Sequence, residues 1–225
     1  MTISAEEVRV LTERCEQFRG SKAPDGYPDS LALCIVDSVQ STGVKYPSVV
    51  NVVNRYRAYR SEQGGSADSD SAEDLLAAFA ELGGHEAWAE RIGNGNRTST
   101  SKGAPLKVYA IEAEARAMIG VGVVTAKDLR SAAANPDSIA AAKAAWLSVT
   151  GQSRGITWHY VQMLAGISGI KPDRMIIRFV AKALDRPVKA VTSSFCVDLL
   201  TAVAPKLDMN ATVLDHAIWN YQRGQ

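Results

Sequence analysis

The chain has 225 residues, of which 46% are hydrophobic and 22% are charged, and its formal net charge is +1. This length and composition are typical of an ordinary globular protein with one domain or two small lobes. Membrane and secreted proteins are not expected, because no apolar run approaches the ~20 residues of a membrane span and the N-terminus lacks a signal-peptide pattern. Cys15, Cys34 and Cys196 are isolated, which gives neither metal-ligand spacing nor a disulfide framework and fits a reducing cytoplasm.

Charge is distributed unevenly along the chain. Residues 61–86 hold seven acidic side chains and no Lys or Arg. Residues 143–190 hold eight Lys or Arg side chains against Asp173 and Asp185. A basic half of this kind is a modest electrostatic footprint for nucleic acid.

The N-terminal part predicts two helices separated by a loop. Residues 4–7 read Ser-Ala-Glu-Glu, a capping box, and apolar residues at helical spacing follow up to Phe18. Residues 22–29 contain two prolines and a glycine and predict a loop. Residues 31–39 are nearly all apolar, with Asp37 as the one charge, and predict a buried helix; by composition alone a buried strand is the alternative.

The middle of the chain predicts several helices and two loops. Residues 62–71 (EQGGSADSDS) are polar and rich in Gly, Ser and Asp, which is typical of a linker. A helix is expected from Ser71, a flexible loop over 93–103 and a further helix over 106–119. Helix starts are also predicted at Thr125 and at Asn135-Pro136.

Residues 150–179 are the most informative stretch. Gly151 and Gly155 predict a tight turn with free backbone N–H groups. The turn opens directly into an apolar helix, so these N–H groups form an anion site suited to phosphate. Arg154 lies within the turn. A plain interhelical turn is the alternative interpretation.

Asp173 follows Pro172 and precedes apolar residues that share one helix face. An aspartate at this position is expected to cap a helix, to act beside one, or both. Further helices are predicted to about Leu184, through Leu200 and through Trp219. The chain shows no internal repeat and no alternating strand pattern, so the predicted fold class is all-α.

Two segments resemble the helix-hairpin-helix DNA glycosylases of the endonuclease III type. Residues 149–157 (VTGQSRGIT) resemble the family's hairpin, Leu-Pro-Gly-Val-Gly-x-Lys-Thr-Ala, and the spacing to Asp173 matches without a gap. Arg178 falls on the family's arginine after that aspartate. Residues 38–42 (SVQST) resemble the family's Ser-Ala-Gln-Ala-Thr, and the two matches occur in the right order.

The resemblance implies a two-lobed helical fold with a DNA-binding cleft between the lobes. Residues 1–41 and 164–225 would form one lobe, and residues 42–163 the other. It also favours the helical interpretation of residues 31–39. The expected protein is a monomer in the cytoplasm, at the nucleoid, that binds duplex DNA.

The resemblance also implies site residues and their roles. Asp173 would stabilise the sugar cation that forms when an N-glycosidic bond breaks, and would orient or deprotonate the attacking water. Gln40 would fill the gap left by the extracted base, although such a glutamine is usually only a surface residue. The DNA backbone would be held by hairpin residues, namely Gly151, Ser153, Arg154 and Gly155. Trp158 and His159 are base-pocket candidates, although buried aromatics are more often core.

Departures from the family pattern limit the expected chemistry. The family's lyase lysine is replaced by Gly155, so base release by water without strand cleavage is expected. The hairpin's second glycine is replaced by Ser153. The four-cysteine loop of an iron–sulfur cluster is missing, so neither a cluster nor another resident metal site is expected; a monovalent cation could bind through hairpin carbonyls. A non-catalytic DNA-binding module is the alternative, and an unrelated helical protein is a third interpretation.

Overall fold

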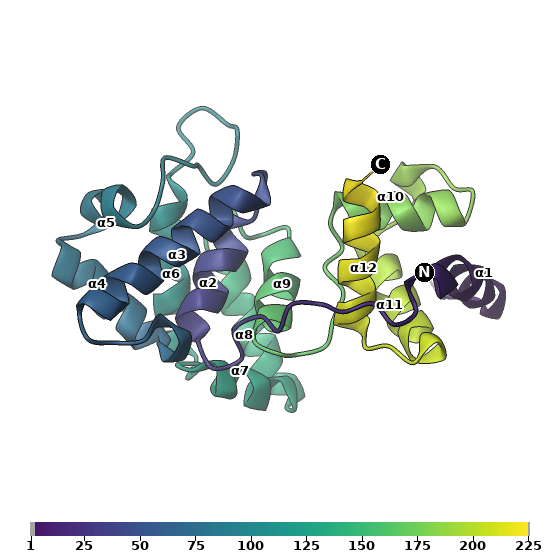
Figure 1. Cartoon of the computed structure of the whole chain (residues 1–225), viewed down its shortest axis with the longest axis horizontal. Helices are drawn as coiled ribbons and strands as arrows, with labels where there is room; N and C mark the ends of the chain where they lie inside the picture. Colours follow the sequence, from purple (N-terminus) through teal and green to yellow (C-terminus); the bar gives the residue numbers. More distant parts are fainter. Residues whose placement is uncertain (1–2, 225) are drawn as a thin grey trace. The chain divides into compact units, whose positions relative to one another are not determined.

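The computed structural model describes residues 3–224, and in this range the chain forms α-helices and short 3-10 turns but no β-strand (Figure 1). The extended pairing recorded there is one isolated antiparallel bridge between Arg97 and Leu106. The predicted all-α class is confirmed. Within the same residues, no helix combines the length and the apolar character that crossing a membrane requires.

The chain divides into two compact units. The central unit comprises Asp25–Ile167, and the terminal unit comprises Met1–Pro24 together with Ser168–Gln225. The expected N-terminal boundary at residue 41 differs from this division. The reason is that the helix over Leu31–Gln40 packs within the central unit instead of with the chain termini.

The central unit is built around that helix, α2, all ten residues of which are buried. Ser30 caps it by accepting a hydrogen bond from the backbone N–H of Leu33 at 3.1 Å. The first six residues of α2, Leu31–Val36, are all apolar and require a core, and α2 is enclosed by α3, α6 and α9 (Figure 1). The predicted buried helix is confirmed. The remaining helices of the unit are α3 (Tyr46–Glu62), α4 (Ala72–Leu82), α5 (His85–Arg91), α6 (Lys107–Gly120), α7 (Ala126–Ala133), α8 (Pro136–Ser148) and α9 (Ile156–Leu164).

Helix α6 carries two buried ionisable side chains into this core. The Nζ atom of Lys107 donates to the carbonyl oxygens of Gln40 at 2.7 Å and Thr42 at 2.6 Å, so it caps the C-terminal end of α2. Burial lowers the pKa of Lys107 to about 8. Glu114 is fully buried, and neither of its carboxyl oxygens has a hydrogen-bond partner among residues 3–224. Burial raises the pKa of Glu114 to about 10.

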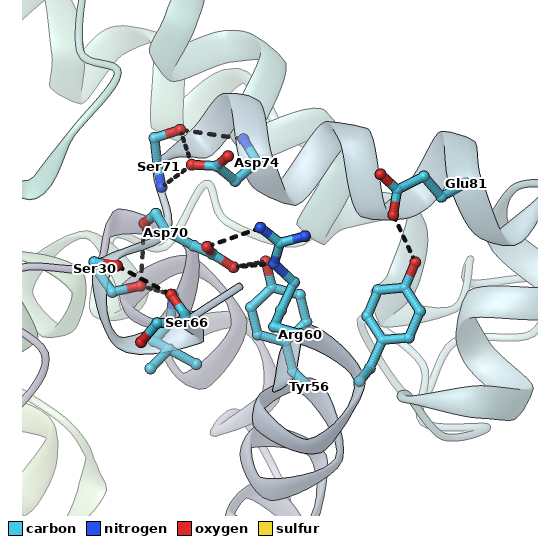
Figure 2. A network of polar contacts seen from close by, with 11 residues as sticks. Ser30, Tyr56, Arg60, Ser66, Asp70, Ser71, Asp74 and Glu81 are labelled. Carbon is cyan, nitrogen blue, oxygen red and sulfur yellow. Dashed lines mark hydrogen bonds and ion pairs between the residues drawn. The ribbon is translucent and has the colours of Figure 1, made fainter. Parts of the chain in front are cut away.

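The stretch predicted as a linker is instead fixed to the central core (Figure 2). The buried carboxylate of Asp70 accepts hydrogen bonds from Arg60 Nε at 2.7 Å and from the Tyr56 hydroxyl at 2.8 Å. Its backbone carbonyl accepts from the Ser30 hydroxyl at 3.1 Å and from the N–H of Ala32 at 3.2 Å. The linker prediction was wrong because one aspartate in a polar sequence joins α3 to the start of α2.

The terminal unit joins an N-terminal helix to three C-terminal ones, which are α1 (Ala5–Cys15), α10 (Arg174–Ala183), α11 (Ser193–Val203) and α12 (Ala211–Arg223). The predicted capping box at the start of α1 is confirmed, with Ser4 and Glu7 exchanging backbone-to-side-chain hydrogen bonds. Helix α10 packs against α12, and α1 packs against α11. Phe18, which follows α1, contacts Phe179 of α10 with ring centroids 5.7 Å apart. Residues from Leu11 to Phe18 and from Ile170 to Ile218 contribute to one buried cluster, which makes the two parts of the sequence a single unit.

Candidate functional site

The turn between α8 and α9 forms at the predicted hairpin residues. The N–H of Gln152 donates to the carbonyl of Val149 at 3.0 Å, and the N–H of Gly155 donates to the carbonyl of Gln152 at 2.9 Å. Gly155 is the N-cap of α9 and has a φ of 75°, in the left-handed region that favours glycine. Gly155 is therefore required by the backbone that starts the helix.

The first turn of α9 presents unpaired N–H groups. No side chain caps this helix. Among the residues that the structure describes, the N–H groups of Ile156, Thr157 and Trp158 have no acceptor. Ser153 and Arg154 are exposed beside them. No Asp or Glu occurs from residue 138 to residue 172. An uncapped helix start can hold an anion through its dipole and its free N–H groups, and Arg154 lies two residues before this one in the chain.

The inner side of the turn is locked by a chain of buried polar groups that the sequence analysis did not identify. Trp146 Nε1 donates to the Thr157 hydroxyl at 3.0 Å, and that hydroxyl donates to Gln152 Oε1 at 2.6 Å. All three side chains are buried. Because Thr157 serves as both acceptor and donor, it ties the end of α8 to the start of α9. This network attaches the turn to the two helices on either side of it.

The space beside Gly151 is occupied by another part of the chain. Gly151 has a φ of 91°, and a Cβ atom built on it would lie 2.7 Å from the Cβ of Thr98. Thr98 belongs to the loop that connects α5 to α6, whose ends pair through the N–H of Thr98 and the carbonyl of Pro105 at 3.0 Å. Because Gly151 has no side chain, the loop between α5 and α6 can pack against it, and the positive φ of the turn is also permitted.

The two base-pocket candidates lie on α9 within the central unit. Trp158 is buried, and its ring centroid lies 6.2 Å from that of Trp146, which is also buried. This packing makes Trp158 part of the core. His159 is partly buried, and burial together with the charge of Lys143 lowers its pKa. His159 is therefore favoured in its neutral form at physiological pH.

Gln40 lies inside the central unit, and its side chain does not project from the surface. It is 1% exposed, and its Oε1 accepts a hydrogen bond from Asn94 Nδ2 at 3.2 Å. Its Nε2 is buried without a partner in the described part of the chain. This placement differs from the expected wedge, because the side chain would have to leave Asn94 and the core before it could enter DNA.

Asp173 lies in the terminal unit as the N-cap of α10. Its Oδ1 accepts from the N–H groups of Met175 at 2.8 Å and Ile176 at 3.2 Å. Its Oδ2 lies 4.0 Å from Lys171 Nζ, and the Asp173 side chain is 20% exposed. The predicted capping role is confirmed, and one carboxylate oxygen is not used by the cap. Such a carboxylate, held by a helix start and accessible to solvent, can stabilise a cation or orient a water molecule.

A second carboxyl group, which the sequence analysis did not identify, belongs to the same segment. Asp215 on α12 is 5% exposed, and its Oδ1 accepts from the N–H of Lys171 at 2.8 Å. Burial raises the pKa of Asp215 to about 7; Lys171 opposes this shift, and the Asp173 charge adds to it. The sequence carries no local signal for this contact, because the two residues are 44 positions apart.

Metal-binding groups are not present in residues 3–224, where no three His, Cys, Asp or Glu side chains are placed to hold an ion. Cys15, Cys34 and Cys196 are buried and free. Burial raises the pKa of Cys15 and Cys196 to about 12 and raises that of Cys34 well above its usual range. These thiols are therefore core side chains. The monovalent cation at the hairpin stays a prediction.

Comparison with known proteins identifies the family to which the chain belongs. Residues 9–223 match the family described as domain of unknown function DUF8548. No curated protein matches the chain, and no solved structure matches it. Because the match spans nearly all of the 225 residues, the chain belongs to the DUF8548 family.

Proposed function

We propose that the protein binds duplex DNA through the α8–α9 hairpin and releases a damaged or modified base by hydrolysis at Asp173. The single observation that carries the binding part is the uncapped start of α9 with exposed Arg154 beside it. Nucleic-acid phosphates are the abundant anions that such a turn can hold without reading sequence. The resemblance of residues 149–157 to a glycosylase hairpin supports the same partner.

The chemical part of the proposal rests on Asp173. Cleavage of an N-glycosidic bond builds positive charge on the sugar, and a fixed carboxylate lowers the barrier by stabilising that charge. Two backbone N–H groups hold Asp173 in place, so little reorganisation is needed during the reaction. The remaining oxygen can orient the attacking water. In the glycosylase family that the hairpin resembles, DNA lies in a cleft between two lobes.

Gly155 supports a monofunctional reaction. A lyase-competent relative uses a lysine amine at this position to form a Schiff base with the sugar. Gly155 has no side chain, and its positive φ makes any replacement at this position strained. The proposed product is therefore an abasic site in an intact strand.

A second candidate function is non-catalytic DNA binding through the same hairpin. Gln40 favours this candidate, because its burial leaves no side chain projecting at the expected wedge position. The two functions are separated by incubating the protein with duplexes that carry alkylated, oxidised or deaminated bases. Base release from any of them supports the glycosylase. Binding without release from the whole panel supports the non-catalytic module.

Replacing Arg154 with Glu is expected to weaken binding to all duplexes alike, by about tenfold at 0.1 M salt, and to lower the slope of log K against log salt by about 0.9. A phosphate contact adds affinity without sequence preference. Fluorescence anisotropy with unrelated duplexes at several salt concentrations measures both quantities.

The matched control is Lys127→Glu. Lys127 is an exposed residue in the first turn of α7, in the same unit, where an acidic side chain suits the helix dipole. This variant has the same change in charge and is expected to keep the wild-type slope. Equal loss of affinity in both variants would show a general charge effect and contradict the hairpin contact.

A further inference from the structure

The segment that leads to Asp173 is attached to α12 by four hydrogen bonds, all within the terminal unit, one of which runs from the Thr212 hydroxyl to the carbonyl of Gly169 at 3.5 Å. The N–H of Gly169 donates to the Thr212 hydroxyl at 3.1 Å, and the N–H of Lys171 donates to Asp215 Oδ1 at 2.8 Å. In the opposite direction, the N–H of Ala211 donates to the Ser168 hydroxyl at 3.1 Å. The first turns of α12 therefore fix the backbone over residues 168–171, immediately before Asp173.

Asp215 places a buried carboxyl group where a neutral acceptor would be sufficient. A hydroxyl suffices for Gly169, where Thr212 accepts the bond. A carboxyl group that is 5% exposed costs free energy to ionise, so burial favours its neutral form. Two charged groups act on the Asp215 carboxyl group: Lys171 favours its ionisation and Asp173 opposes it. The next residue on α12 is His216, whose pKa is also lowered by the Lys171 charge. A carboxyl group here therefore responds to the charge state of the Asp173 segment.

We infer that Asp215 is a positioning residue of the Asp173 site: by accepting the Lys171 N–H, it fixes the backbone that carries the Lys171 ammonium group beside Asp173. This inference rests on the proposed function of Asp173. The Lys171 ammonium lies 4.0 Å from Asp173 Oδ2, and the Lys171 backbone is bound to Asp215. One lysine thus connects an accessible carboxylate to a buried carboxyl group. The Asp173 carboxylate, whose side chain is 20% exposed, thus has the Lys171 ammonium group as a neighbouring cation.

The titration of Asp215 is expected to depend on the charges of Asp173 and Lys171. Carbon-13 NMR of the side-chain carboxyl groups, recorded over a pH series on the full chain, measures this dependence without DNA. The Asp215 signal is expected to have its midpoint near neutral pH. Asp173→Asn removes a like charge and should lower the midpoint by about one unit, whereas Lys171→Met removes an opposite charge and should raise it by a similar amount.

Asp198→Asn provides the matched control, because Asp198 is exposed on α11 in the same unit. This variant should leave the Asp215 midpoint unchanged. An ordinary acidic midpoint for Asp215, or a midpoint that neither Asp173→Asn nor Lys171→Met moves, would overturn the inference.

A second readout compares two substitutions of Asp215 itself. Asp215→Asn is permanently neutral and keeps an oxygen that can accept the Lys171 N–H, so it should retain kcat to within about threefold. Asp215→Leu removes the acceptor and should lower kcat by about tenfold or more at an unchanged KM. Equal loss in both variants would contradict positioning through the hydrogen bond to the Lys171 N–H. If the wild-type protein releases no base but the NMR shifts are present, the proposed function fails and the dependence of Asp215 on these charges stands.

Discussion

Asp173→Asn is expected to lower the rate of base release by about 10²–10³-fold, with DNA affinity nearly unchanged or slightly higher. The amide has the size of the carboxylate but not the charge that stabilises the sugar cation. Asn is also a good N-cap, so its side-chain oxygen can keep the bonds from Met175 and Ile176 that start α10. Single-turnover assays on a duplex with the preferred lesion, followed by alkaline cleavage of the abasic strand, measure the rate.

Asp198→Asn is the control for this substitution and should retain the wild-type rate. Full activity of Asp173→Asn would remove the catalytic assignment. The uncut strand provides a further check, since scission is expected only after alkali or heat. A covalent adduct trapped with borohydride would show an amine nucleophile. Lys171 would then be the first candidate, because its Nζ lies 4.0 Å from Asp173.

Glu114→Met is expected to stabilise the central unit by roughly 3 kcal/mol at pH 7. Burial raises the pKa of Glu114 to about 10 from an ordinary value near 4.5. For an acid whose pKa is raised by folding, stability is fully present below the unfolded pKa and is lost as pH rises through the folded pKa. The wild-type protein should therefore lose stability from about pH 4.5 to pH 10, by about 1.4 kcal/mol per unit. Methionine has no group that titrates or needs a hydrogen-bond partner.

Denaturant unfolding at pH 5, 7 and 9, followed by tryptophan fluorescence, tests this expectation, since three of the four tryptophans lie in the central unit. The gain from Glu114→Met should grow with pH. Glu90→Met is the control, because Glu90 is exposed on α5, and it should change stability by less than about 0.5 kcal/mol at every pH. A gain that does not depend on pH would contradict the assignment of Glu114 as a buried neutral acid.

The helices were largely predictable because their signals are local. The capping boxes at Ser4 and Ser71 and the Asn135-Pro136 start each place donor and acceptor within four residues, and the structure has all three caps. The apolar residues of α2 also predict its burial without any distant contact, since such a run is stable only inside a core. Fold class therefore follows from short-range chemistry.

The site was less predictable because its supporting contacts join distant positions. Asp215 meets Lys171 across 44 residues, and Asn94 meets Gln40 across 54. A glutamine at a helix end has the same local pattern whether it projects into solvent or lies in a core, so sequence alone could not distinguish the two. The same limit applies to Gly151: the sequence predicts the turn, but not that Thr98 packs against it.

The burial of all three native thiols has a practical consequence for studying this protein in solution. Maleimide dyes and spin labels react with accessible thiolates, and Cys15, Cys34 and Cys196 present neither exposure nor ionisation at neutral pH. A cysteine introduced by Ser153→Cys would therefore be labelled selectively without first removing the native ones. A probe at this exposed hairpin position would test whether added DNA contacts the hairpin, in a chain whose cores are unaltered.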